Sequence, residues 1–337
     1  MSIAAETVNA KGGKDGVFII PEFELDSGKT IHNLRIAYTL YGERNPQGSN
    51  LILLLPGTSN TRYGVRGHIG IDAAFDPSKY CIVSVDAIGG GDSSQPGDGL
   101  RHRFPIYSVA DMVRAQYELV THGLSLHGRP LAAVGGASMG AFQALQWAAA
   151  YPDAMQRAVL LVPAVKAGGL FRQTVLQMKR IVALDANWSD GSYSIQPATG
   201  LAIAGRHYFP WTVTDAYLET MPQDIVERDM DAVATNFASW DAWSLIRRYE
   251  ASSSFDLAQS FDGDLLHALN RIQAKLLVLP CAQDRLLGID GARQIAQQAQ
   301  EADYAEIQSN LGHLAWRAVP GSPQTTFLTK TISTWLR

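Results

Sequence analysis

Short apolar segments, separated by turn residues, recur along the sequence and constrain its fold more than any other feature. Their side chains do not alternate between apolar and polar, so we expect both faces of each strand to be covered, as in a parallel sheet. Helical patterns lie between them. This alternation predicts a mostly parallel, doubly wound α/β sheet with right-handed crossovers. The predicted strands are residues 36–40, 51–55, 81–85, 131–134, 159–162 and 276–279.

The alternation of strands and helices stops after Pro163 and resumes near Lys275. The sequence between them, residues 165–272, contains helical patterns rich in Trp, Tyr and Met and no clear strand. We interpret this segment as a helical lid inserted into one α/β core. That core is predicted to comprise residues 17–164 and 273–337.

Charge and hydropathy exclude several classes of partner. The 28 basic residues are balanced by 32 acidic ones, so the net charge is −4 and no basic surplus is present to bind nucleic acid or an anionic membrane. No apolar run approaches the roughly 20 residues of a membrane span. Residues 1–16 are polar and rich in Gly and Lys, which predicts a flexible leader and not a signal peptide.

The two cysteines, Cys81 and Cys281, lie in apolar, strand-like contexts and show no metal-binding spacing. A disulfide between them is one interpretation. A reduced, cytoplasmic protein is the favoured one, because disulfides concentrate in oxidising compartments.

A G-x-S-x-G motif, Gly136–Gly140, stands between a predicted strand and a predicted helix. In this context a strained turn lifts Ser138 above the sheet edge, and the flanking glycines allow the backbone to pass closely. The helix N-terminus also favours an oxygen that becomes anionic. The alternative is an ordinary Gly-rich turn with a serine cap, but the strand–turn–helix context favours a nucleophile.

A nucleophilic serine requires a base, and His313 is the best placed of the eight histidines. It follows an apparent strand at residues 304–308 and precedes the final helix, where an α/β hydrolase carries its histidine. A histidine that only packs the loop is the alternative. The others lie in polar, loop-like or Gly-containing segments: His32, His68, His102, His122, His127, His207 and His267.

The acid that orients this base is predicted to be Asp284, which follows the strand at residues 276–279 at the carboxyl edge of the sheet. It would accept the imidazole Nδ1–H and stabilise the imidazolium. A surface ion pair with Arg285 is the alternative interpretation. Asp290 is a better candidate for a helix cap and Asp303 for a solvated turn.

Two backbone amides are predicted to stabilise the oxyanion of the tetrahedral intermediate. One belongs to Met139, directly after the nucleophile, and the other to Thr58 in the loop after an early strand. Pro56 in that loop has no N–H to donate. Since the sequence contains no dinucleotide fingerprint, P-loop or zinc motif, no cofactor or metal is expected.

In this order, these residues resemble the α/β-hydrolase superfamily and, more narrowly, the homoserine O-acetyltransferase family with its short-chain ester hydrolase relatives. The resemblance extends from about Leu34 to Leu336. It implies a homodimer joined through the helical lids and, for the transferases, acetyl-CoA as the acyl donor. It also implies a substrate-binding role for Arg206, as the partner of the acceptor's carboxylate. The segments that carry it are residues 104–116, 135–147, 151–152, 185–193 and 200–206.

One departure from the family favours one of its activities over the other. The transferases usually carry an Asp directly after the histidine base, where the acid helps to hold an amino-acid acceptor, whereas Leu314 stands here. An apolar residue suits water, an alcohol or a nonpolar ester better than a zwitterion. The sequence therefore favours a serine hydrolase that cleaves a short-chain carboxylic ester. An acyl-CoA-dependent O-acyltransferase is the alternative, and the intact Ser, Asp, His order disfavours a silent binding protein.

Overall fold

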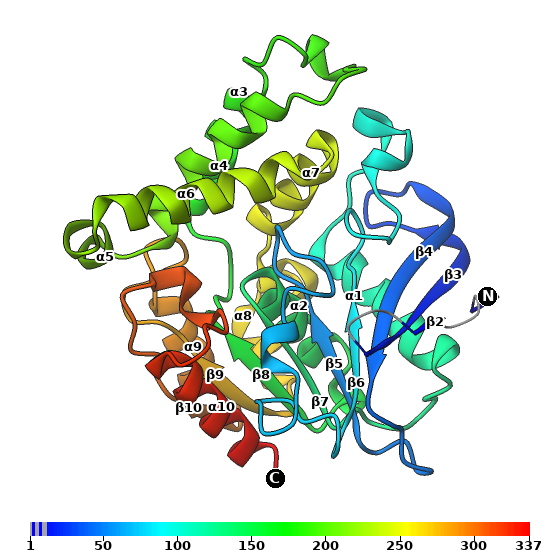
Figure 1. The fold of residues 1–337 in the computed structure, drawn as a ribbon. Coiled ribbons are helices and arrows are strands. Elements are labelled where there is room, and N and C mark those ends of the chain that lie inside the picture. The colour runs from blue at the N-terminus through cyan, green and yellow to red at the C-terminus, as the bar shows by residue number, and fades with distance from the viewer. Residues whose placement is uncertain (1, 4–6, 9–11) are drawn as a thin grey trace.

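One ten-stranded sheet forms the centre of the computed structural model, which describes residues 2–3, 7–8 and 12–337 (Figure 1). Its strands are β1 (Ser2–Ile3), β2 (Thr7–Val8), β3 (Lys14–Glu24), β4 (Thr30–Tyr41), β5 (Leu51–Leu55), β6 (Cys81–Val85), β7 (Ala133–Ala137), β8 (Arg157–Leu161), β9 (Lys275–Leu279) and β10 (Ala302–Tyr304). The order across the sheet is β1-β3-β4-β6-β5-β7-β8-β9-β10, and β2 pairs with β3. Neighbours from β6 to β10 are parallel, whereas β3, β4 and β6 pair antiparallel. The prediction of a mostly parallel α/β fold is confirmed.

The N-terminal part of the sheet differs from the prediction. Strand β3 was not predicted, because its residues alternate between buried and accessible positions and so lack a continuous apolar run. The predicted leader, residues 1–16, is wrong for residues 14–16, which begin β3, and β1 and β2 pair with that same strand. The leader's residues 1, 4–6 and 9–11 lie outside the described part of the chain.

Helices cover both faces of the sheet, and β5 shows how one strand serves two cores. Leu51, Leu53 and Leu55 pack into a cluster with α1 (Val109–Glu118), α2 (Met139–Ala150), α8 (Leu265–Asn270) and α9 (Asp290–Gln298). Ile52 and Leu54 point to the other face and pack with α10 (Pro323–Trp335). Because β5 is buried on both sides, its apolar run is continuous, as the sequence predicted.

The segment predicted as a lid is helical and contains no strand over residues 165–272, all of which the structure describes. Its main helices are α3 (Gly169–Val182), α4 (Ala198–Thr212), α5 (Asp215–Thr220), α6 (Gln223–Ala238) and α7 (Ala242–Ser253). These helices share a separate core that includes Trp188, Trp240 and Trp243. Figure 1 shows α3, α4 and α6 above the sheet edge at which α2 begins.

The last part of this segment returns to the sheet. Phe255, Leu257 and Leu269 belong to the core that α2 and β5 share, and not to the core of the lid helices. Among the described residues, none of the helices combines the length and the apolar character that a membrane span requires.

Candidate active site

Ser138 occupies a strained turn between a strand and a helix. Strand β7 ends at Ala137, α2 begins at Met139, and Ser138 between them has φ 58° and ψ −120°. This left-handed conformation is costly for a residue with a side chain and persists only where the surroundings enforce it. Here the Ser138 N–H donates to the carbonyl of Leu161 at 3.0 Å, and its carbonyl accepts from the N–H of Phe142 at 3.0 Å. The hydroxyl is thereby raised above the sheet edge.

The two glycines of the motif are required because each lies in close contact with another segment of the backbone. A Cβ on Gly136 would lie 2.6 Å from the carbonyl carbon of Gly140. A Cβ on Gly140 would lie 2.4 Å from the carbonyl oxygen of Leu55, at the end of β5. No side chain fits at either distance, so these glycines fix how closely α2 approaches β5.

Replacing Gly140 with Ala is therefore expected to lower the free energy of unfolding by about 1–3 kcal/mol, as overpacking does elsewhere, and to displace Ser138. Urea denaturation and esterase assays measure the two effects. Gly169→Ala, at the start of α3, is the matched control, because the nearest atom to its added Cβ is a side-chain nitrogen 4.0 Å away. Equal stability of both variants would contradict the packing argument.

The structure brings the three predicted catalytic side chains into one hydrogen-bonded chain. His313 Nε2 lies 2.8 Å from Ser138 Oγ, and His313 Nδ1 lies 2.7 Å from Asp284 Oδ2. The second carboxylate oxygen, Oδ1, accepts from the N–H groups of Leu286 at 2.9 Å and Leu287 at 3.1 Å. Since Asp284 can only accept, Nδ1 carries the proton and Nε2 is the acceptor that faces the serine hydroxyl. This arrangement can deprotonate Ser138 during attack on a carbonyl carbon.

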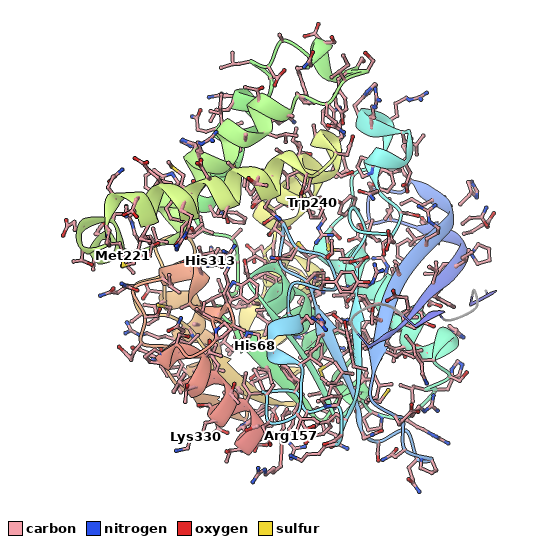
Figure 2. The ribbon with its side chains drawn as sticks, in the orientation of Figure 1. His68, Arg157, Met221, Trp240, His313 and Lys330 are labelled. Carbon is pink, nitrogen blue, oxygen red and sulfur yellow. The ribbon has the colours of Figure 1, made fainter. Side chains whose placement is uncertain are left out.

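The segment that carries His313 is held between the lid and the sheet domain (Figure 2). His313 lies in a 3-10 helix, Gly312–Trp316, and Gly312 packs against the end of α4 with φ 55°. From the other side, His68 Nε2 donates to the carbonyl of Trp316 at 2.7 Å. Burial lowers the pKa of His68, so this ring stays neutral and serves as a structural hydrogen-bond donor.

The loop after β5 carries the predicted oxyanion donor Thr58, and the lid anchors this loop. The turn closes through a hydrogen bond from the Asn60 N–H to the Gly57 carbonyl at 3.2 Å. Arg248 of α7 is completely buried and donates to the carbonyls of Gly57 at 3.0 Å and Asn60 at 3.2 Å. The other predicted donor, Met139, begins α2, where the first N–H groups lack partners within the helix. The sequence analysis missed Arg248; its signal in the sequence is the pair of adjacent arginines, Arg247 and Arg248, in the middle of α7.

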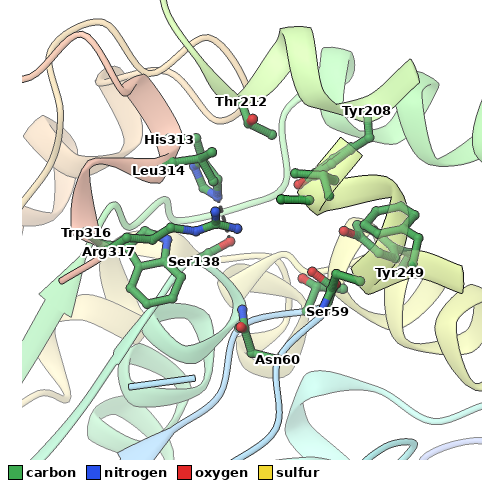
Figure 3. A pocket seen from close by; sticks show the side chains of 16 residues that line it. Ser59, Asn60, Ser138, Tyr208, Thr212, Tyr249, His313, Leu314, Trp316 and Arg317 are labelled. Carbon is green, nitrogen blue, oxygen red and sulfur yellow. Dashed lines mark hydrogen bonds between the residues drawn. The ribbon is translucent and has the colours of Figure 1, made fainter. Parts of the chain in front are cut away.

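A cavity of about 260 Å³ opens over Ser138 and His313 (Figure 3). Thr58 and Leu314 line it, together with a group of polar side chains that the sequence analysis did not single out. Tyr208 and Tyr249 are hydrogen-bonded to each other, and burial raises the pKa of Tyr249 to about 12. Both phenols therefore remain protonated. The other newly found polar residues are Ser59, Asn60, Thr212, Asn236 and Arg317.

Arg206, the predicted substrate-binding residue, lies away from this cavity. It lies on the exposed side of α4, and its guanidinium pairs with Asp231 of α6 at 2.8 Å. The helix phase explains the difference, because Tyr208 and Thr212 of the same helix face the cavity.

The described residues contain no cluster of three or more His, Cys, Asp or Glu side chains that could hold a metal ion. Cys81 and Cys281 are buried and form no disulfide with each other.

Three comparisons relate this chain to known proteins. Residues 50–315 match the family model described as the alpha/beta hydrolase fold. A homoserine O-acetyltransferase from Methanosalsum zhilinae is 30% identical over 88% of this chain and 68% of its own length. Two solved structures, each 25% identical, are similar over nearly their whole length. One is an acetylester hydrolase from Corynebacterium glutamicum (TM-score 0.89, 98% of this chain and 97% of that one). The other is the acetyl esterase MekB (TM-score 0.88, 95% and 96%).

Proposed function

The chain belongs to the α/β-hydrolase family, in the group that contains homoserine O-acetyltransferases and acetyl esterases, and on this premise we propose that it is a serine hydrolase of short-chain carboxylic esters. The resemblance predicted from the sequence is thus confirmed, and the chain is an enzyme of this superfamily. The observation that carries the proposal is the hydrogen-bonded chain from Ser138 through His313 to Asp284, which opens into a small cavity.

In the proposed first step, Ser138 Oγ attacks the ester carbonyl carbon while His313 Nε2 takes the hydroxyl proton. Asp284 stabilises the imidazolium that forms. The amides of Thr58 and Met139 donate to the developing oxyanion. The imidazolium then protonates the leaving alcohol, and an acyl-serine remains.

In the second step, water takes the place of the alcohol. His313 removes a proton from that water as it attacks the acyl-serine, and returns the proton to Ser138 Oγ when the carboxylic acid leaves. The cavity of about 260 Å³ lies below the roughly 300–1,000 Å³ of sites for drug-sized ligands, which supports a short acyl chain.

An acyl-CoA-dependent O-acyltransferase is the second candidate, because a curated relative is named a homoserine O-acetyltransferase. The same acyl-serine would then pass to an alcohol and not to water. Hydrolysis is favoured because Leu314 lines the cavity and because, among the described residues, no Asp or Glu lines it to hold an ammonium group.

The test compares two assays on the same protein. One follows thiol release from acetyl-CoA with and without L-homoserine, and the other follows hydrolysis of para-nitrophenyl acetate. We expect ester hydrolysis and no homoserine-dependent thiol release. Homoserine-dependent release of CoA would overturn the proposal in favour of the transferase.

We also propose that the protein is a homodimer joined through its lids. Helix α3, the connection that follows it and α4 expose large apolar side chains: Leu176 (41% exposed), Leu184 (85%) and Ile203 (49%). Light scattering is expected to give twice the mass of the chain, and the double variant Leu184→Glu/Ile203→Glu is expected to give the mass of one. Ile71→Glu, at a residue that is 77% exposed outside the lid, is the control. A monomeric parent protein would contradict this proposal.

A further inference from the structure

Arg317 is a cation at the active-site cavity for which the proposed mechanism has no use. It follows directly after the 3-10 helix that carries His313, and it lines the cavity together with Ser138. Figure 3 shows its side chain extending into the cavity, with the guanidinium on the side of Ser138 and His313. The residue remains accessible to solvent, so a ligand in the cavity can reach it.

Within the described part of the chain, no carboxylate lies within ion-pair distance of the Arg317 guanidinium. The surrounding protein displaces water and lowers the pKa of Arg317. The carboxylate of Asp229 attracts the Arg317 guanidinium from beyond ion-pair distance and so raises its pKa. This carboxylate is already bound by Tyr217 Oη at 2.5 Å and by Arg228 at 2.8 Å. By contrast, Arg206 has its own carboxylate partner.

The rest of the cavity lining adds hydrogen-bond donors and no negative charge. Tyr208 and Tyr249 present phenols that stay protonated, and Asn60 and Asn236 present amides. Of the Asp and Glu residues that the structure describes, none lines the cavity. A cavity with one cation, several donors and no acid favours an anion and disfavours an ammonium group or a zwitterion.

We propose that the ester cleaved at Ser138 carries a carboxylate, and that Arg317 binds this carboxylate while the ester carbonyl lies over Ser138. This inference rests on the proposed function and names its substrate class. A guanidinium suits the role, because its planar N–H pairs match the two oxygens of a carboxylate. The carboxylate belongs either to the leaving alcohol or to the acyl group, and the two arms of the test distinguish these sources.

The test uses two pairs of esters that differ in charge. Meta-acetoxybenzoate and its methyl ester vary the alcohol, whereas mono-para-nitrophenyl succinate and para-nitrophenyl acetate vary the acyl group. We expect the parent enzyme to prefer the anionic member of one pair. Arg317→Gln should lower kcat/KM for that member by about 10- to 100-fold, chiefly through KM, and change the neutral ester by less than about threefold. Arg317→Lys should restore part of the loss.

Arg206→Gln is the matched control, since it removes a guanidinium outside the cavity. It should leave kcat/KM unchanged for both the neutral and the anionic ester. An equal loss for neutral and anionic esters, or no loss for either, would overturn the role of Arg317. Calorimetric titration of succinate and benzoate into the Ser138→Ala variant tests the anion site without turnover. If either anion binds and its affinity falls at least tenfold when Arg317→Gln is added, the anion site is supported. This holds even if no ester is hydrolysed, because the absence of hydrolysis would reject only the proposed function. Unchanged binding of both would reject the site.

Discussion

Replacing Ser138 with Ala is expected to reduce kcat for para-nitrophenyl acetate by at least about 1,000-fold, because removing the nucleophile of such a triad costs up to about 10⁶ in kcat. The side-chain oxygen contacts His313, and the backbone bonds of the turn do not involve it. The variant should therefore keep the melting temperature of the parent within a few degrees. Initial rates and thermal denaturation followed by circular dichroism measure both quantities.

Ser239→Ala serves as the control for this variant, since Ser239 lies at the exposed end of α6 and is not one of the residues that line the cavity. Its activity should equal that of the parent. Turnover by Ser138→Ala at more than about a tenth of the parental rate would remove Ser138 from the mechanism.

Asp284→Asn is expected to lower kcat by about 10³- to 10⁴-fold with little change in KM, because the wrong imidazole tautomer is stabilised. The structure indicates how this happens. Leu286 and Leu287 donate to Oδ1 of Asp284, so the amide oxygen of an Asn would occupy that position and its NH₂ would face His313. Nδ1 must then accept, Nε2 carries the proton, and the base can no longer take the proton of Ser138.

Steady-state kinetics on the same aryl ester measure this effect. Asp290→Asn provides the matched control, because Asp290 is an exposed carboxylate in the first turn of α9, close in sequence but outside the hydrogen-bonded chain. Similar losses in both variants, or a loss that appears only in KM, would contradict the orienting role of Asp284.

The sequence predicts best those strands in which every residue is buried. Strands β5 and β6 have the predicted bounds because both their faces are buried, which leaves an uninterrupted apolar run. Strand β3 was missed because its alternation reflects a half-exposed antiparallel hairpin. The start of α1 depends only on local contacts, because Ser108 Oγ accepts from the N–H of Asp111, three residues along the chain, at 3.0 Å.

Some residues of the candidate site could likewise be predicted from the sequence, and others could not. The proximity of Ser138, Asp284 and His313 could be predicted, because each follows a strand or a local motif in an informative chain order. The cavity lining could not, since Tyr249 and Arg317 meet only when α7 of the lid closes over the segment after His313. Arg206 was predicted from its resemblance to a family motif, but the phase of α4 turns it toward Asp231.

The most direct test of the account is to isolate the acyl-enzyme. Para-nitrophenol is a good leaving group, so acylation by para-nitrophenyl acetate should outpace deacylation and let the acetyl-enzyme accumulate. We would stop the steady-state reaction with acid and map the modified peptides by mass spectrometry. The account predicts one acetyl group per chain on Ser138 and none in the Ser138→Ala variant. Turnover with the acetyl group on another residue, or with the same labelling in that variant, would contradict it.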